Sequence, residues 1–148
     1  MMPHDDIGTK EDIAIISIQT SHRLLLEAKE LMKHKYNEGA SNRIYYSVFR
    51  SISAIHALDG NRFKSHKEAL GQFNKNYVNE NIFSREYGKK IHEIQILRHN
   101  TDYGYNIIPT DKQVKDNFDF ANKLYNECKK YCERKLNKNI SVGKQNQQ

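Results

Sequence analysis

Residues 97–105 concentrate side chains that can handle phosphate or move protons. The guanidinium of Arg98 carries a fixed fork of donors that matches a phosphate group, and His99 and Tyr103 can transfer protons or contact a base. An ordinary explanation also exists, because an arginine in the last turn of a helix interacts with the terminal carbonyls and can pair with Asp102 four residues later. On the residues alone, both interpretations remain open.

Two further segments could support such chemistry. Tyr45 and Tyr46 are adjacent, and since neighbours on a helix diverge, one is expected to pack in the core while the other lines a cleft or interface with its hydroxyl bonded. His66 lies near Lys64 and follows a serine that can cap a helix, so it is either a hydrogen-bonding loop residue or part of an anion site. Together with Arg98, the candidate RNA-binding or nucleotide-binding residues are Tyr46, Lys64 and His66.

His56 is discounted as a catalytic residue. It shares a helical face with Ile52 and Ile55, which is typical of a histidine packed in the core with its polar atoms satisfied. We therefore expect a structural role for it.

The composition predicts one domain with a thin core. The chain has 148 residues, of which 37% are hydrophobic and 28% charged, and its mean hydropathy is −0.87. That balance suits an elongated helical bundle or a protomer that completes its core by association, so we expect a homodimer. The net charge of +6 fits an anionic partner such as RNA, although the same charge also serves ordinary solubility.

The sequence shows no membrane span, no signal peptide and no set of cysteines for a metal site. No apolar run approaches the roughly 20 residues of a membrane span, and the N-terminus lacks the apolar core of a signal peptide. Cys128 and Cys132 have no second pair with which to complete a metal site, so we expect buried reduced thiols and neither metal nor cofactor. These features predict a cytoplasmic protein with no membrane partner.

Helices must position the candidate residues, because apolar residues recur at intervals of three and four between Pro3 and Pro109, the only prolines of the chain. Gly39 is expected to separate the first two helices, with Ser41 or Asn42 capping the second. The pattern predicts helices over about 9–35, 42–58, 66–77, 84–97 and 111–136, with a loop over 100–109.

The predicted core centres on the second helix, which is the most apolar. The expected domain covers residues 10–136, between a flexible N-terminus over 1–9 and a polar, frayed tail over 137–148. The first helix is predicted to bury the stripe Ile13, Ile16, Leu24, Leu25, Ala28, Leu31 and Met32.

Three motifs, in this order along the chain, resemble those of the HEPN family. The resemblance covers about residues 10–136 and is closest to a branch that carries an arginine, a short spacer and then Asp-Tyr. The matching residues are Tyr45-Tyr46-Ser47-Val48-Phe49, then Ser65-His66 with Phe73 and Tyr77-Val78, and finally Arg98 with Asp102 and Tyr103.

The resemblance implies an all-α, up-and-down bundle of four to five helices that is usually a homodimer. It also implies a partner, because such proteins are often encoded with a minimal nucleotidyltransferase as a toxin and antitoxin pair. Members with the full motif cut RNA without a metal ion: the arginine stabilises charge on the phosphate, and a histidine after a further four to six residues moves the proton of the 2'-hydroxyl.

This chain departs from the full motif. The positions of that histidine hold Tyr103, Gly104 and Tyr105, so the resemblance implies catalytic candidates Arg98, Asp102 and Tyr103 without the usual histidine. His99 could replace it only if the helix ended before it, since neighbours on a helix point about 100° apart. Tyr105 stands where some relatives carry a tyrosine that the nucleotidyltransferase adenylylates, and it is the candidate modification site.

Two functions therefore remain open. The missing histidine favours a non-catalytic or weakly active partner of a minimal nucleotidyltransferase in a toxin–antitoxin or defence module. The basic charge favours a metal-independent endoribonuclease toxin that binds and cuts RNA at a cleft of the dimer interface. In either case, we expect Asp102 to hold Arg98 and the turn in place rather than to act as a base.

Overall fold

Short-range signals set where three of the helices begin. The side chains of Thr9, Ser65 and Thr110 each accept a hydrogen bond from a backbone N–H three residues later, as expected of N-cap residues. The computed structural model describes residues 9–104 and 107–143. Its helices are α2 (Lys10–Lys33), α3 (Asn37–Leu58), α4 (His66–Phe73), the π-helical turn η1 (Asn74–Val78), α5 (Glu86–Asp102) and α6 (Asp111–Leu136).

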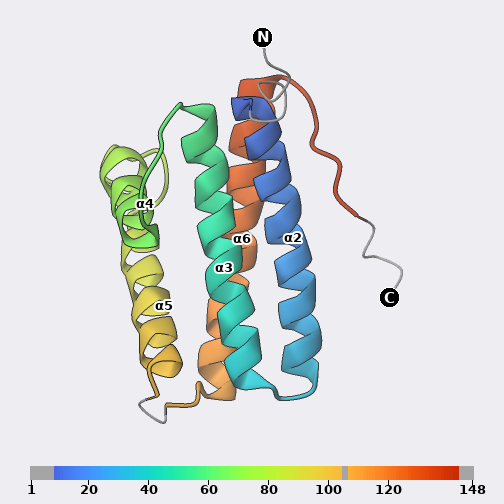
Figure 1. Cartoon of the computed structure of the whole chain (residues 1–148), viewed down its shortest axis with the longest axis vertical. Coiled ribbons are helices and arrows are strands. Elements are labelled where there is room, and N and C mark those ends of the chain that lie inside the picture. Colours follow the sequence, from blue (N-terminus) through green and yellow to red (C-terminus); the bar gives the residue numbers. More distant parts are fainter. Residues whose placement is uncertain (1–8, 105–106, 144–148) are drawn as a thin grey trace.

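The helices run up and down the long axis of the molecule (Figure 1). Helices α2, α3 and α6 contact one another, while α4 and α5 pack against α3 on its other side (Figure 1). Over the described residues the chain is all-α with no strand, which confirms the predicted fold class. The helices that carry Tyr46, His66 and Arg98 meet at α3.

The centre of the core is α3, as predicted. The side chains of Ile44, Val48, Ile52 and Ile55 are all at most 1% exposed. Burying a side chain of this size stabilises the folded state by about 1.5–3 kcal/mol. Because α3 contacts every other α-helix, it is the scaffold on which the site is built.

The buried face of α2 differs from the predicted stripe. Ile13 and Ile16 are 38% and 52% exposed, whereas Ser21 and Ile18 are fully buried. Small residues let α2 approach α3 closely: Ser21 Oγ donates to the carbonyl of Ser47 at 2.9 Å and lies 2.8 Å from Ser51 Oγ. A pattern that counts only apolar residues misses such a face, because here buried serines satisfy one another across the helix contact.

Two predicted boundaries were wrong. The break between α2 and α3 lies at Lys35, which has φ 63°, and Gly39 is inside α3, where an added Cβ would lie 3.3 Å from Leu31 Cδ1. Gly39 thus serves close helix packing rather than chain reversal. Helix α5 continues to Asp102, past the predicted loop start at Asn100, and Thr101 Oγ1 bonds the carbonyl of Leu97 within it.

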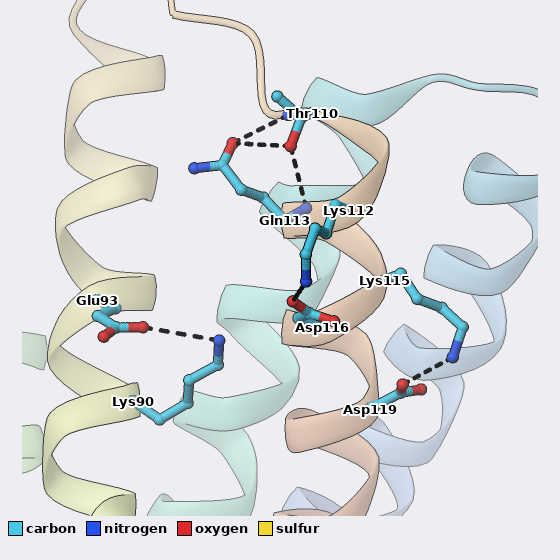
Figure 2. Close-up of polar contacts among 8 residues, drawn as sticks. All are labelled: Lys90, Glu93, Thr110, Lys112, Gln113, Lys115, Asp116 and Asp119. Carbon is cyan, nitrogen blue, oxygen red and sulfur yellow. Dashed lines mark hydrogen bonds and ion pairs between the residues drawn. The ribbon is translucent and has the colours of Figure 1, made fainter.

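The charged side chains in the first turns of α6 form ion pairs within the helix. Thr110 and Gln113 form a reciprocal capping box, and Lys112 pairs with Asp116 at 2.8 Å one turn along (Figure 2). Lys115 pairs with Asp119 at 2.7 Å in the same way (Figure 2). The mixed charges at this end of α6 therefore form a solvated face of paired side chains.

The chain after α6 folds back onto the bundle. Asn137 adopts a left-handed conformation with φ 58°, and Ile140 is only 4% exposed. The backbone N–H of Ile140 donates to Glu133, and Gln19 on α2 donates to the carbonyl of Ser141. The expectation of a frayed segment from Asn137 is therefore wrong for residues 137–143, because one apolar side chain anchors them.

Both cysteines are buried free thiols, as expected from their spacing on α6. Burial raises the pKa of Cys132 to about 12 and also raises the pKa of Cys128, so both are protonated at neutral pH. Among the described residues, no helix combines the length and the apolar character that crossing a membrane requires.

Candidate functional site

Arg98 lies near the end of α5, over the two tyrosines of α3. Its Cζ atom is 4.7 Å from the ring centroid of Tyr45 and 5.5 Å from that of Tyr46, and its Nη2 donates to the hydroxyl of Tyr46 at 3.0 Å. Such cation–π contacts orient a guanidinium without using all of its donors. The tyrosine pair divides as predicted: Tyr45 is buried, while the half-buried Tyr46 offers its hydroxyl to Arg98.

Asp102 pairs with Arg98 one turn later on α5. Asp102 Oδ2 lies 2.8 Å from Arg98 Nε, but the N–H direction does not meet the requirements of a hydrogen bond. The two side chains are 35% and 29% exposed respectively, so solvent screens the pair and its contribution to stability stays below about 1 kcal/mol. The predicted pairing is present, and it holds the guanidinium near the tyrosines.

His66 reaches the same site from α4. As the first residue of that helix, it is set in place by Ser65, whose Oγ accepts from the N–H of Glu68. Its ring stacks on Phe49 with centroids 3.8 Å apart, and its Nδ1 lies 3.2 Å from the hydroxyl of Tyr45. Tyr45 therefore contacts both His66 and Arg98.

The electrostatics of the site keep His66 neutral. Burial lowers the pKa of His66, and the positive charge of Arg98 lowers it further. Burial raises the pKa of the Tyr45 hydroxyl, which stays protonated. At neutral pH the site therefore combines a permanent cation with a histidine that is able to accept a proton.

A pocket of about 690 Å³ opens between α4 and α5, and we call it the arginine pocket. Its volume lies in the range of small-molecule sites. The polar side chains that line it with Tyr45 and Asn74 are His66, Lys67, His92, Gln95, Arg98 and His99. None of the described residues that line the pocket carries a carboxylate, so the pocket suits an anion such as a phosphate.

Of the other predicted site residues that the structure describes, only His99 lines this pocket. His99 lines the arginine pocket, but it is exposed and still within α5, so it does not take the place of a histidine beyond the helix end. Tyr103 follows the last turn, is 66% exposed and packs against His99 rather than into the pocket. Lys64 lines a different cavity, and Tyr105 lies outside the described residues.

Three side chains at the site are not among the predicted site residues. Phe49 fixes the plane of the His66 ring, and Lys67 and His92 line the arginine pocket. One signal was available: His92, Gln95 and His99 recur at intervals of three and four, which places polar side chains on one face of α5. No comparable signal joins this face to α4.

Comparisons with known proteins agree with this architecture. The family model described as "HEPN domain" matches residues 16–131, a span that contains every residue of the arginine pocket. Over 110 residues the chain is 32% identical to the "UPF0332 protein" of Thermotoga maritima, covering 74% of this chain and 83% of that protein. Over 126 residues it is 25% identical to "Putative toxin MJ0142" of Methanocaldococcus jannaschii, covering 85% of this chain and 84% of that protein.

Proposed function

The chain belongs to the HEPN domain family, and on this basis we propose that it is the HEPN component of a prokaryotic toxin–antitoxin module that binds RNA and cuts it without a metal ion. The relative named "Putative toxin MJ0142" supports the module. One observation carries the reaction: His66 and Arg98, which are remote in sequence, meet at Tyr45 in a pocket without acidic residues. His66 thus offers an imidazole where the motif after Arg98 lacks one.

The chemistry follows from the roles that these groups can take. In the tautomer that carries its proton on Nδ1, His66 donates to Tyr45 and its Nε2 lone pair can take the proton of a ribose 2'-hydroxyl. The 2'-oxygen then bonds to phosphorus while the bond from phosphorus to the 5'-oxygen breaks, and that oxygen takes a proton from water. The products are a 2',3'-cyclic phosphate and a 5'-hydroxyl, and Arg98 stabilises the charge on the phosphoryl oxygens.

RNA cleavage in EDTA tests this proposal. The wild-type protein should release ends with a 2',3'-cyclic phosphate, and His66→Gln and Arg98→Ala should each lower the rate about 10²–10⁴-fold, the range of a lost proton-transfer or charge-stabilising group. Arg23→Ala is the matched control, because Arg23 lies on the exposed side of α2 and pairs only with Glu27 among described carboxylates. Absence of cleavage in the wild-type protein, or full activity in both pocket variants, would refute the proposal.

The second candidate is a non-catalytic partner of a minimal nucleotidyltransferase. Asp102 and Tyr46 contact two nitrogens of Arg98, Nε and Nη2. This favours the second candidate, because these two nitrogens are then not available to a phosphate. This function predicts a stable complex with a minimal nucleotidyltransferase and no RNA cleavage by either protein alone. Co-expression followed by size-exclusion chromatography measures the first outcome, and the EDTA assay measures the second.

A further inference from the structure

A second cavity of about 530 Å³ lies on the other side of His66, and we call it the loop pocket. Its walls come from the start of α2, the last turns of α3, the loop over 60–65 and the start of α4. Its size falls within the range of pockets that hold a small organic ligand. The pocket combines cationic side chains, aromatic rings and a buried hydrogen-bond acceptor without a partner among the described residues. All three indicate the same kind of ligand.

The charge of the loop pocket is positive. Arg62 and Lys64 line it, together with Lys10, and none of the described residues that line it carries a carboxylate. Two acidic groups flank the loop. Glu68 accepts from the backbone N–H of Lys64 rather than from its side chain, and Asp59 contacts Tyr77, Tyr131 and Lys135 instead of the loop cations. Within residues 9–104 and 107–143, the side chains of Arg62 and Lys64 form no ion pair, so their charges can meet an anionic ligand.

Aromatic rings form the other walls. Phe63 packs edge to face against His56 with centroids 4.5 Å apart, and Phe49 stacks on His66. Rings beside cations are the combination that binds nucleotides, since a base stacks on the ring while its phosphate meets the cation. A flat base is therefore a better match than a peptide carboxylate.

His56 adds an unsatisfied acceptor. It is 3% exposed, and its Nε2 must carry the proton because it bonds the carbonyl oxygen of Ala69 at 2.9 Å. Burial lowers the pKa of His56, so the ring is neutral and Nδ1 holds a lone pair. That Nδ1 atom is buried with no partner among the described residues, although His56 lines the pocket. The predicted core histidine is thus only half satisfied.

We propose that the loop pocket binds one nucleotide of RNA, with the base beside Phe63, an exocyclic amino group of the base donating to His56 Nδ1, and the phosphate on Arg62 and Lys64. Phe63 packs edge to face against His56, so its side chain rotates to let the base reach Nδ1. His66 lines both pockets, so a strand held at Arg98 continues directly into the loop pocket. Only this last placement, next to the scissile phosphate, rests on the proposed function.

Calorimetric titration with mononucleotides tests the loop pocket without RNA cleavage. The full chain should bind AMP and CMP at least about tenfold more tightly than UMP, which lacks an exocyclic amino group, or inorganic phosphate, because one lost hydrogen bond to a buried acceptor corresponds to about that factor. Arg62→Ala and Phe63→Ala should each weaken AMP binding about tenfold. Lys138→Ala, a lysine beyond α6, is the control that should leave it unchanged.

The outcomes separate this inference from the proposed function. Equal affinity for AMP, UMP and phosphate, or AMP binding that Arg62→Ala and Phe63→Ala leave unchanged, overturns the nucleotide pocket even if RNA is cut. Selective AMP or CMP binding that depends on both residues supports the pocket even if EDTA assays show no cleavage. Binding of acidic peptides in preference to every mononucleotide also overturns it. Because Arg62 and Phe63 lie in an exposed loop, circular dichroism should show that both variants fold.

Discussion

Arg98 and His66 approach Tyr45 from two different helices, so one buried tyrosine links the two side chains that would act on a phosphate. Tyr46 and Asp102 each contact Arg98, and Phe49 fixes the plane of the imidazole. Small changes at this scale should alter the chemistry of the arginine pocket without unfolding the bundle.

The pH dependence of RNA cleavage should report the titration of His66. A base must be neutral, and burial with the nearby Arg98 lowers the pKa of His66 below 6.5. We therefore expect kcat/KM to rise with pH at low pH, with the midpoint of the rise below the usual value of about 6.5 for a histidine, and to level off at higher pH. His66→Gln should abolish this limb, whereas His34→Gln, at the exposed residue that follows α2, should preserve it. A limb that persists in His66→Gln would assign the proton transfer to another group.

Asp102→Asn distinguishes a positioning role from a catalytic one. The partly exposed ion pair with Arg98 predicts a loss of less than about 1 kcal/mol in the free energy of unfolding. RNA affinity should change by less than about tenfold, since the guanidinium keeps its contacts with Tyr45 and Tyr46. Arg98→Ala should be far more damaging in the same binding and cleavage assays. Equal damage from the two substitutions would contradict the positioning role.

At the scale of elements, small buried side chains determine which face of α2 packs against α3. The buried serines and alanines let the two helices approach, and they turn Ile13 and Ile16 toward solvent. The arginine pocket depends on α3, because α4 and α5 both pack on it. Damage to the contact between α2 and α3 would therefore reach the site.

The two isoleucines of α2 provide a matched test of its orientation. Ile18 is fully buried, so Ile18→Ala should lower the free energy of unfolding by about 2–5 kcal/mol through lost burial and a cavity. Ile16 is 52% exposed, and Ile16→Ala should stay within about 0.5 kcal/mol of the wild type. Urea denaturation measures both. The reverse order would restore the predicted stripe and refute the orientation described for α2.

At the scale of the whole molecule, the thin core and the exposed apolar side chains favour association. Ile96, which lines the arginine pocket, is 46% exposed, and Tyr103 beyond the end of α5 is 66% exposed. A homodimer that covers this part of α5 would bring two arginine pockets together. We expect such a dimer, as the family resemblance implies.

Light scattering at micromolar concentration tests the dimer and its location. The wild-type protein should have twice the mass of the chain, and Ile96→Asp should shift it toward the monomer by placing a charge in the apolar contact. Ile16→Asp, an equivalent change on α2 away from the pocket, should leave the mass unchanged. A strict monomer in the wild type, or loss of the dimer with Ile16→Asp alone, would refute an interface at the arginine pocket.

The sequence by itself determined the features that depend on residues within one or two helical turns. Thr9, Ser65 and Thr110 cap their helices through a backbone N–H three residues later, and Arg98 pairs with Asp102 as predicted. The apolar periodicity also identified α3 as the central helix. These features are local because a cap bonds an N–H three residues away and an ion pair on a helix spans four residues.

Only the tertiary structure decided which face of α2 is buried and which residues share the site. Ser21 is buried because it finds Ser47 and Ser51 on another helix, a partner choice that hydropathy does not encode. His66 joins Arg98 because α4 and α5 pack on the same side of α3, while Lys64, only two residues earlier, lies in the loop pocket. Contacts between residues remote in sequence depend on how helices pack, and no spacing within the chain specifies that arrangement.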